Sequence, residues 1–183
     1  HTAVVVKYGP SSSNPTKYAA AGCKVENQTS ITCDTVPGIG AALHWRVTVD
    51  GQDSGVSSDT TDYASPEITG VTAGADSATT GEETVTITGT NFGPAAHTAV
   101  VVKYGPSSSN PTKYTAAGCK VENQTSITCN SMPGVGAALY WKVTIKEQDS
   151  GPSSATTKYA NPSIDSDGLS GDAMAPSGSD TRG

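Results

Sequence analysis

Apolar and polar residues alternate along several short stretches of the chain. In residues 139–145 every second position is apolar: Leu139, Trp141, Val143 and Ile145. Successive side chains of a β-strand point to opposite faces, so this pattern predicts an antiparallel strand with one buried face and one wet face. The same alternation in residues 43–49 and 83–89 predicts two similar strands. The unbroken run at 99–102 is apolar on both faces and predicts a more central strand.

Turn-forming residues separate these stretches. Glycine, proline, asparagine and serine gather between the apolar segments, as in residues 104–111. No stretch has the 3.6-residue period of an amphipathic helix. Short alternating segments at regular spacing predict about seven strands per repeating unit. The expected fold class is therefore all-β, built from β-sandwiches.

The sequence repeats itself. Residues 1–68 align with residues 97–164 at a constant offset of 96 residues, and 53 of the 68 aligned positions are identical. Domains that separated long ago would have diverged further, so this identity indicates recent duplication within a tandem array. A period of this length is too long for a solenoid unit and matches one complete small β-sandwich.

The repeat predicts three parts that differ in completeness. Residues 65–160 form one whole repeat, residues 1–64 lack the first strands of a repeat, and residues 161–183 start a further repeat or form a junction. The chain is therefore expected to be a window from a longer array. We expect the missing strands to come from upstream in the same chain or from a neighbouring molecule, unless the boundary is arbitrary.

Composition limits the partners. Charged residues make up 15% of the chain, the formal net charge is −6 and the isoelectric point is about 4.9. An acidic surface repels phosphate, so no nucleic acid is expected as a partner. No apolar run is long enough to cross a bilayer, so no membrane insertion is expected in this segment.

Several segments resemble one family of immunoglobulin-like domains. These segments are residues 66–71 (Pro-Glu-Ile-Thr-Gly-Val), 88–93 (Thr-Gly-Thr-Asn-Phe-Gly), 100–105, 133–136 and 159–162. Together they resemble the IPT/TIG domain, which plexins and some transcription factors share. The resemblance covers residues 65–160 fully and residues 1–64 in part. It implies immunoglobulin-like β-sandwiches joined by short junctions, and it leaves function open, since the family includes receptor ectodomains, adhesins and DNA-binding factors.

Each repeat contains two cysteines. They are Cys23 and Cys33 in the first repeat, and Cys119 and Cys129 in the second. Four cysteines allow three pairings, and the symmetry of the repeat favours the local pairs, so that each domain carries its own disulfide. Zinc is the competing interpretation, but the spacing lacks a short Cys-x-x-Cys and a supporting histidine.

Each repeat also contains one N-glycosylation sequon. The acceptors are Asn27 and Asn123, each followed by Gln-Thr at a predicted exposed hairpin turn. One such triplet often arises by chance, but two at the same repeat position beside a predicted disulfide favour glycosylation. Residues 106–111 are equally consistent with O-linked sugar and with a solvated loop. Disulfides and sugar together predict an extracellular or cell-surface protein.

The sequence contains no convincing catalytic, metal or cofactor motif. No serine, threonine or cysteine lies in a sequence motif that would pair it with a catalytic base. No glycine-rich segment has the pattern of a phosphate-binding loop. Asp165 and Asp167 weakly resemble the start of a calcium loop, but a solvated junction is the favoured interpretation. Trp45 and Trp141 are possible stacking platforms for a ligand, and their inward register favours core positions instead. The chain is therefore not expected to be an enzyme.

These observations favour a structural repeat unit of an extracellular, glycosylated filament or cell-surface stalk. The expected partners are neighbouring copies or repeats in a linear assembly, together with covalently attached glycans. The alternative is a receptor or adhesin ectodomain that binds a protein or glycan, which predicts a divergent repeat with exposed aromatic residues. A DNA-binding use of the fold would need clustered basic loops, and the chain has only two arginines, Arg46 and Arg182.

Overall fold

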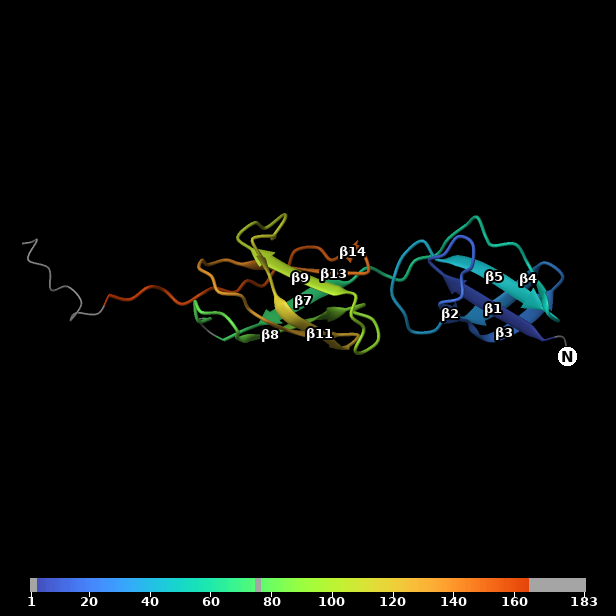
Figure 1. Cartoon of the computed structure of the whole chain (residues 1–183), viewed down its shortest axis with the longest axis horizontal. Coiled ribbons are helices and arrows are strands. Elements are labelled where there is room, and N and C mark those ends of the chain that lie inside the picture. Colours follow the sequence, from blue (N-terminus) through green and yellow to red (C-terminus); the bar gives the residue numbers. More distant parts are fainter. Residues whose placement is uncertain (1–2, 75–76, 165–183) are drawn as a thin grey trace, which may run out of the picture.

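The computed structural model describes residues 3–74 and 77–164 of the chain. Two β-sheet units lie end to end, so this part of the chain is elongated (Figure 1). All fourteen elements in the described part are strands, and none is a helix. The predicted all-β class is therefore confirmed. The third predicted part, 161–183, is described only up to residue 164, and the weak calcium-like segment lies outside the described residues.

The second unit contains eight strands in two sheets. The strands are β7 (Glu67–Thr72), β8 (Thr84–Thr90), β9 (Val100–Gly105), β10 (Tyr114–Thr115), β11 (Ala117–Asn123), β12 (Ser126–Asn130), β13 (Tyr140–Ile145) and β14 (Gln148–Asp149). One sheet has the order β10-β9-β13-β14 and the other has the order β11-β12-β8-β7. All pairings within them are antiparallel, as in an immunoglobulin-like β-sandwich.

The core of the second unit lies between these sheets. Its fully buried members include Val85, Ile87, Val102, Val121, Ile127, Trp141 and Val143. The alternation predicted for residues 139–145 is confirmed, because its four apolar side chains expose at most 1% of their surface. The central position predicted for the apolar run at 99–102 is also found, because β9 lies between β10 and β13. Val101 nevertheless exposes 45% of its surface, since among the described residues no further layer covers the outer face of this sheet.

The first unit contains six strands that correspond to the last six of the second unit. They are β1 (Val4–Gly9), β2 (Tyr18–Ala19), β3 (Ala21–Asn27), β4 (Ser30–Asp34), β5 (His44–Val49) and β6 (Gln52–Asp53). One sheet has the order β2-β1-β5-β6, and the other is the hairpin β3-β4. In the second unit β12 pairs with both β11 and β8. Its equivalent in the first unit, β4, pairs only with β3 among the described residues.

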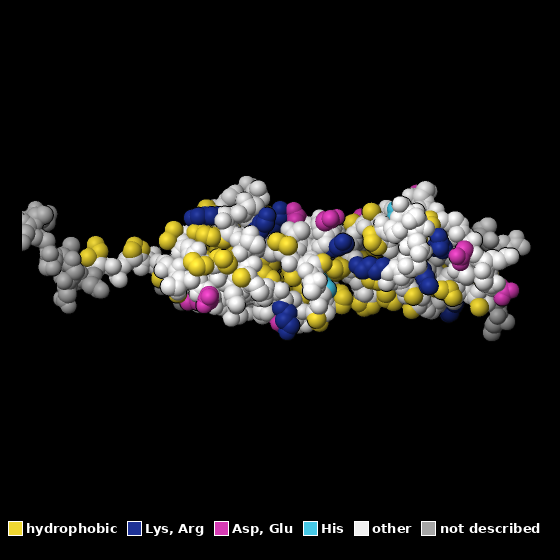
Figure 2. All heavy atoms as spheres, viewed as in Figure 1, with side chains coloured by type: hydrophobic (Ala, Val, Ile, Leu, Met, Phe, Trp, Pro, Cys, Tyr) yellow, Lys and Arg dark blue, Asp and Glu magenta, His cyan; other side chains and the backbone are white. Residues whose placement is uncertain are grey.

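The incomplete second sheet leaves one face of the first unit open. A hollow of about 1220 Å³ is lined there by apolar residues that include Val4, Val25, Ile31, Val47 and Val49. Val25 exposes 52% of its surface, whereas its equivalent Val121 is fully buried. Figure 2 shows hydrophobic side chains along this side of the unit, where β3 lies in Figure 1. Among the described residues no strand of the first unit takes the position of β7 and β8, and the hollow at this position is lined by these apolar residues and by polar residues of the β3-β4 turn.

Candidate junction and glycosylation sites

The two units meet through Ile39, which lies in the loop between β4 and β5. Its side chain exposes 7% of its surface and belongs to the core cluster of the second unit. Gly93 lies against it so closely that a Cβ at this position would collide with Cγ2 of Ile39. Gly93 also has a φ of +82°, a conformation that glycine adopts without strain. Glycine at position 93 therefore allows the first unit to pack directly against the second.

Two side-chain amides of the second unit hold the connecting segment. Nε2 of Gln148 donates a hydrogen bond to the carbonyl of Tyr63 at 2.8 Å. Nδ2 of Asn91 donates to the carbonyl of Ser65 at 3.0 Å. Pro66, the next residue along, is buried and has a fixed φ. The connection is thus short, proline-stiffened and hydrogen-bonded on both sides.

The hairpin turn before Gln148 is strained where it meets the first unit. Lys146 and Glu147 have φ values of 45° and 68°. The equivalent turn of the first unit is Asp50–Gly51, a pair that this kind of turn favours. Non-glycine residues with positive φ cost about 1–3 kcal/mol each. Cγ of Lys146 would lie 3.6 Å from a Cβ on Gly40, so the strained turn is adjacent to the junction loop.

Tyrosine hydroxyls fix the loop that carries Ile39. The hydroxyl of Tyr18 donates to the carbonyl of Ile39 at 2.8 Å and accepts from its N–H at 3.0 Å. The hydroxyl of Tyr63 lies 2.6 Å from that of Tyr8 and donates to the carbonyl of Val36. Burial, and then the hydrogen bond with Tyr8, raise the pKa of Tyr63 above its ordinary value. These bonds hold the junction loop in one conformation.

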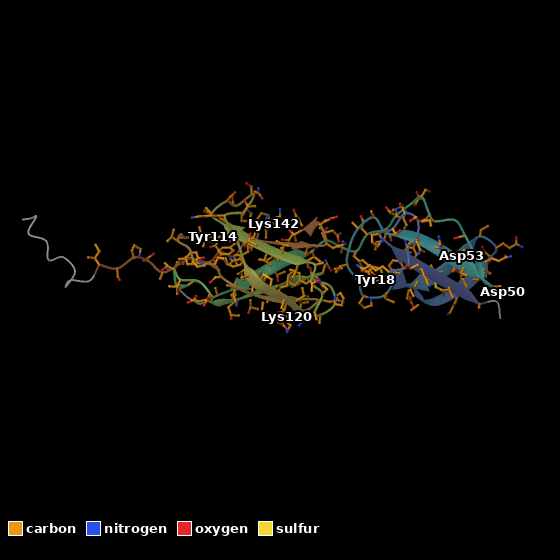
Figure 3. All side chains as sticks on the ribbon, viewed as in Figure 1. Tyr18, Asp50, Asp53, Tyr114, Lys120 and Lys142 are labelled. Atoms are coloured by element: carbon orange, nitrogen blue, oxygen red, sulfur yellow. A yellow bond between two sulfur atoms is a disulfide. The ribbon has the colours of Figure 1, made fainter. Side chains whose placement is uncertain are left out.

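The far end of the second unit has the same loop, held by the equivalent tyrosine and, in addition, by the N–H of Gly134, which donates to the carbonyl of Thr79 at 2.9 Å. The hydroxyl of Tyr114 donates to the carbonyl of Val135 at 2.9 Å and accepts from its N–H at 3.0 Å. That N–H is the main cause of a lowered pKa at Tyr114. Figure 3 shows Tyr18 and Tyr114 at corresponding ends of the two units. Val135, however, exposes 62% of its surface, so the second unit ends in a formed but uncovered junction loop.

The hydrophobic periodicity of the chain does not identify these junction residues. Ile39 and Val135 both lie between two glycines, in Pro-Gly-Ile-Gly and Pro-Gly-Val-Gly. Such segments predict turns. The available signal was one apolar side chain in the middle of an otherwise turn-like segment, repeated at the same position of both repeats. Gly93 gave a similar signal as the last residue of Asn-Phe-Gly.

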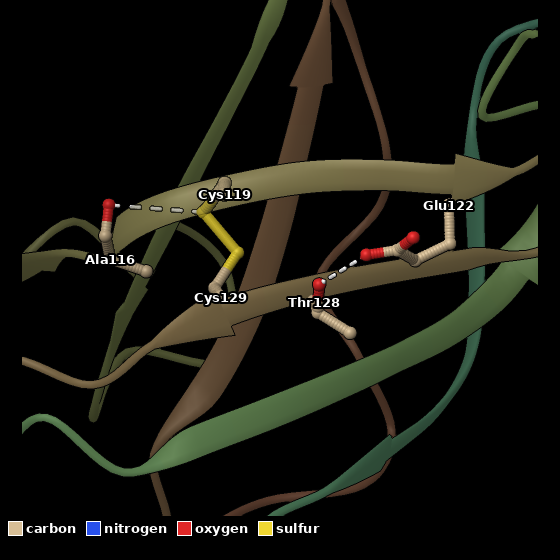
Figure 4. Close-up of a disulfide and its surroundings, with 5 residues drawn as sticks. All are labelled: Ala116, Cys119, Glu122, Thr128 and Cys129. Carbon is tan, nitrogen blue, oxygen red and sulfur yellow. Dashed lines mark hydrogen bonds between the residues drawn. A yellow bond between two sulfur atoms is a disulfide. The ribbon is translucent and has the colours of Figure 1, made fainter. Parts of the chain in front are cut away.

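A disulfide joins the two strands of each cysteine-bearing hairpin. Cys119 of β11 bonds to Cys129 of β12 (Figure 4), and Cys23 of β3 bonds to Cys33 of β4. The structure thus brings together the local pairs that the repeat symmetry favours. All four cysteines are used in this way, so no thiolate remains for the competing zinc interpretation.

The two sequon asparagines lie at exposed hairpin turns. Asn27 ends β3 and Asn123 ends β11, and two residues separate each from the next strand. Oδ1 of Asn27 accepts two hydrogen bonds from Thr29, one from its N–H and one from its hydroxyl, both at 2.9 Å. Asn123 and Thr125 repeat this arrangement at 2.8 and 2.9 Å. The turn therefore holds each amide at the tip of a hairpin, where a glycan has room.

In residues 3–74 and 77–164, no group of three or more His, Cys, Asp or Glu side chains is placed to hold a metal ion. His97 lies with Nε2 2.7 Å from the carbonyl of Phe92, so its ring supports a loop. No helix in the described part of the chain has the length and apolar character needed to cross a membrane.

One family model matches the chain, and one solved structure has limited similarity to it. The family model described as the IPT/TIG domain matches residues 66–159, slightly more than half of the chain. Among solved structures, the chain is similar to one described as the full extracellular region of plexin A4, domains 1 to 8, at 14% identity and a TM-score of 0.40. That similarity covers 85% of this chain but only 14% of the length of the plexin chain. Among curated proteins no sequence matches the chain.

Proposed function

Because the chain belongs to the IPT/TIG domain family, as its motifs predict, we propose that it is a structural repeat unit of an extracellular, glycosylated filament or cell-surface stalk. In this proposal immunoglobulin-like units follow one another in a linear array, and the partners of each unit are neighbouring copies or repeats. Residues 65–160 are the complete repeat, and residues 1–64 and 161–183 belong to the repeats on either side.

The observation that carries the proposal is the fixed junction between the two units. Independent domains are usually joined by exposed, flexible linkers, and they move relative to one another. Here Ile39 is buried against the second unit and Gln148 binds the backbone of Tyr63. A rod that must keep its shape over many units needs joints of this kind. The junction therefore supports a structural role over a role as a set of separate binding modules.

The disulfides and the sequons support an extracellular location. Disulfides persist in oxidising compartments and are rare in the cytosol. Glycans on Asn27 and Asn123 would project from the tips of the two corresponding hairpins. At those positions they would cover exposed strand edges and hinder proteases, which is useful in a long rod exposed to the environment.

Electron microscopy of the purified natural material tests this proposal, together with its intact mass before and after deglycosylation. Regular filaments with extra mass at Asn27 and Asn123 are expected. Thr29→Ala and Thr125→Ala should each remove one glycan, because the sequon needs the hydroxyl. Thr16→Ala is the matched control, since Pro15 already prevents a sequon at Asn14. Short monodisperse particles without added mass would contradict the proposal and favour a receptor or adhesin ectodomain.

A further inference from the structure

We propose that the free end of the second unit is a docking surface for the leading end of a second copy of this chain. The free end consists of Met132, Pro133, Val135, Gly136 and Pro162. The leading end consists of Gln28, Val49, Asp50 and Gln52 in the first unit. This inference rests on the proposed function and identifies the surfaces through which copies join head to tail.

Equivalent residues of the internal junction and the free end differ in burial. Three positions of the internal junction have equivalents at the free end: Ile39 with Val135, Gly40 with Gly136, and Pro66 with Pro162. The first member of each pair is buried and the second is exposed. Val135 exposes 62% of its surface and Met132 exposes 37%. At the internal junction the leading end of the second unit covers the corresponding residues of the first unit. We therefore expect the leading end of another copy to cover the free end in the same way.

The loop at the free end is already held in one conformation. Tyr114 holds the backbone of Val135 through two hydrogen bonds, as Tyr18 does for Ile39. The hydroxyl of Tyr159 donates to the carbonyl of Met132. Ordering a loop on binding costs free energy, and a loop that is already held avoids that cost. The uncovered loop therefore has the conformation that packs at the internal junction.

The leading end of a second copy carries residues equivalent to those that contact the first unit at the internal junction. Gln124, Ile145 and Gln148 of the second unit line a hollow of about 230 Å³ at the internal junction. Their equivalents in the first unit are Gln28, Val49 and Gln52, so both amides are retained and the aliphatic side chain is similar. Gln148 donates to the carbonyl of Tyr63 at 2.8 Å. In a head-to-tail pair, Gln52 of one copy donates in the same way to the carbonyl of Tyr159 of the other.

The two ends of the chain carry opposite charges at equivalent positions of the junction. Lys17 lines a hollow at the internal junction together with the turn of Lys146 and Glu147. The equivalent of Lys17 at the free end is Lys113, whose Nζ lies 3.5 Å from the carbonyl of Val135. The equivalent of Lys146 is Asp50, which Figure 3 places at the opposite end of the molecule from Tyr114. Head-to-tail docking brings Lys113 and Asp50 together, and opposite charges favour this orientation.

Ile164, which follows the free end, exposes 79% of its surface. Its equivalent Ile68 packs against the core of the second unit. When the free end docks on the first unit of another copy, Ile164 enters the apolar hollow next to Val25 and Val49 of that copy. This contact buries an exposed isoleucine and part of the open core face. Burial of that apolar surface is the main driving force expected for association.

The test is sedimentation of the disulfide-bonded 183-residue chain at concentrations up to about 1 mM, since small interfaces of this type give weak association. The wild-type chain is expected to self-associate with a dissociation constant on the order of 100 µM. Val135→Asp should weaken association at least about tenfold by placing a charge in the apolar contact. Val101→Asp is the matched control, because Val101 is exposed on β9 and away from both ends, and it should leave association unchanged.

A charge exchange gives a second and independent readout. Lys113→Glu should weaken association a few-fold, and adding Asp50→Lys in the same chain should restore it. No association by the wild-type chain, equal effects of Val135→Asp and Val101→Asp, or no rescue by Asp50→Lys would each overturn the inference. Those results would leave glycosylated filaments of natural material unaffected. The absence of such filaments would instead reject the proposed function, whatever the sedimentation result.

Discussion

Tyr159 shows how one hydroxyl fixes the loop at the end of the second unit. Its side chain exposes 3% of its surface, and its hydroxyl lies 2.7 Å from that of Tyr104 and donates to the carbonyl of Met132. The N–H of Met132 in turn donates to Tyr104 at 2.8 Å. Burial, followed by the hydrogen bond with Tyr104, raises the pKa of Tyr159 above its ordinary value. The phenol is thus held in its neutral form.

We expect the free energy of unfolding to fall as the pH rises above about 10, the ordinary pKa of tyrosine. The unfolded chain loses the proton of Tyr159 first, because the folded-state pKa is the higher one. The stabilisation is therefore complete below the unfolded pKa and is lost as the pH rises toward the folded pKa.

Urea denaturation at pH 8 and pH 10.5 measures this loss. Tyr159→Phe should cost about 1 kcal/mol at pH 8 through its lost hydrogen bonds, and it should flatten the decline at high pH. Tyr140→Phe, on the outer face of β13, is the matched control and should keep the wild-type decline. The same decline in wild type and Tyr159→Phe would show that ionisation of Tyr159 is not its cause.

The hairpins β3-β4 and β11-β12 differ in their surroundings although their sequences are nearly the same. Ile127 of β12 lies opposite Ile87 of β8, so the second hairpin is part of a larger sheet. The first hairpin has no such neighbour within the described residues. We therefore expect the first hairpin to depend more on its disulfide for its folded conformation than the second hairpin does.

We expect the two disulfides to differ in what their removal changes. Replacing Cys119 and Cys129 together by serine should lower the free energy of unfolding by about 2–3 kcal/mol, as loop closure predicts, and leave the hairpin folded. Replacing Cys23 and Cys33 should also expose the β3-β4 amides to solvent, since few other contacts hold them. Hydrogen exchange of the two hairpins distinguishes these effects. Equal protection of both hairpins in the two double variants would contradict the expectation.

These hairpins also show which features sequence patterns can predict. Residues 21–30 and 117–126 are identical, and the turn near the sequon and the local disulfide follow from that local sequence. Burial does not follow from it, because Val25 is half exposed and Val121 is fully buried. Burial depends on whether a strand such as β8 lies on top, and β8 is distant in the sequence. The exposure of Val101 has the same origin, since an apolar run predicts a central strand but cannot show whether another layer covers it.

At the scale of the whole molecule, the junction decides whether two sandwiches form a rod or a flexible pair. Ile39 contributes to the core of a unit other than its own, and Gly93 provides the space for it. No periodicity in either repeat predicts this contact. It arises because the end of one unit is complementary to the start of the next, and the repeat places the same loop, with Val135, at the free end.

Ile39→Asp should therefore uncouple the two units without unfolding either of them. A carboxylate at this buried position costs several kcal/mol unless it reaches water, and separation of the units is the easiest way to reach water. NMR relaxation should then give each unit a shorter rotational correlation time, close to that of a single sandwich. Val135→Asp is the matched control, since it places the same charge at the equivalent exposed position and should leave the units tumbling as one body. A common long correlation time in Ile39→Asp would mean that the connecting segment, through Gln148 and Tyr63, is sufficient to keep the rod stiff.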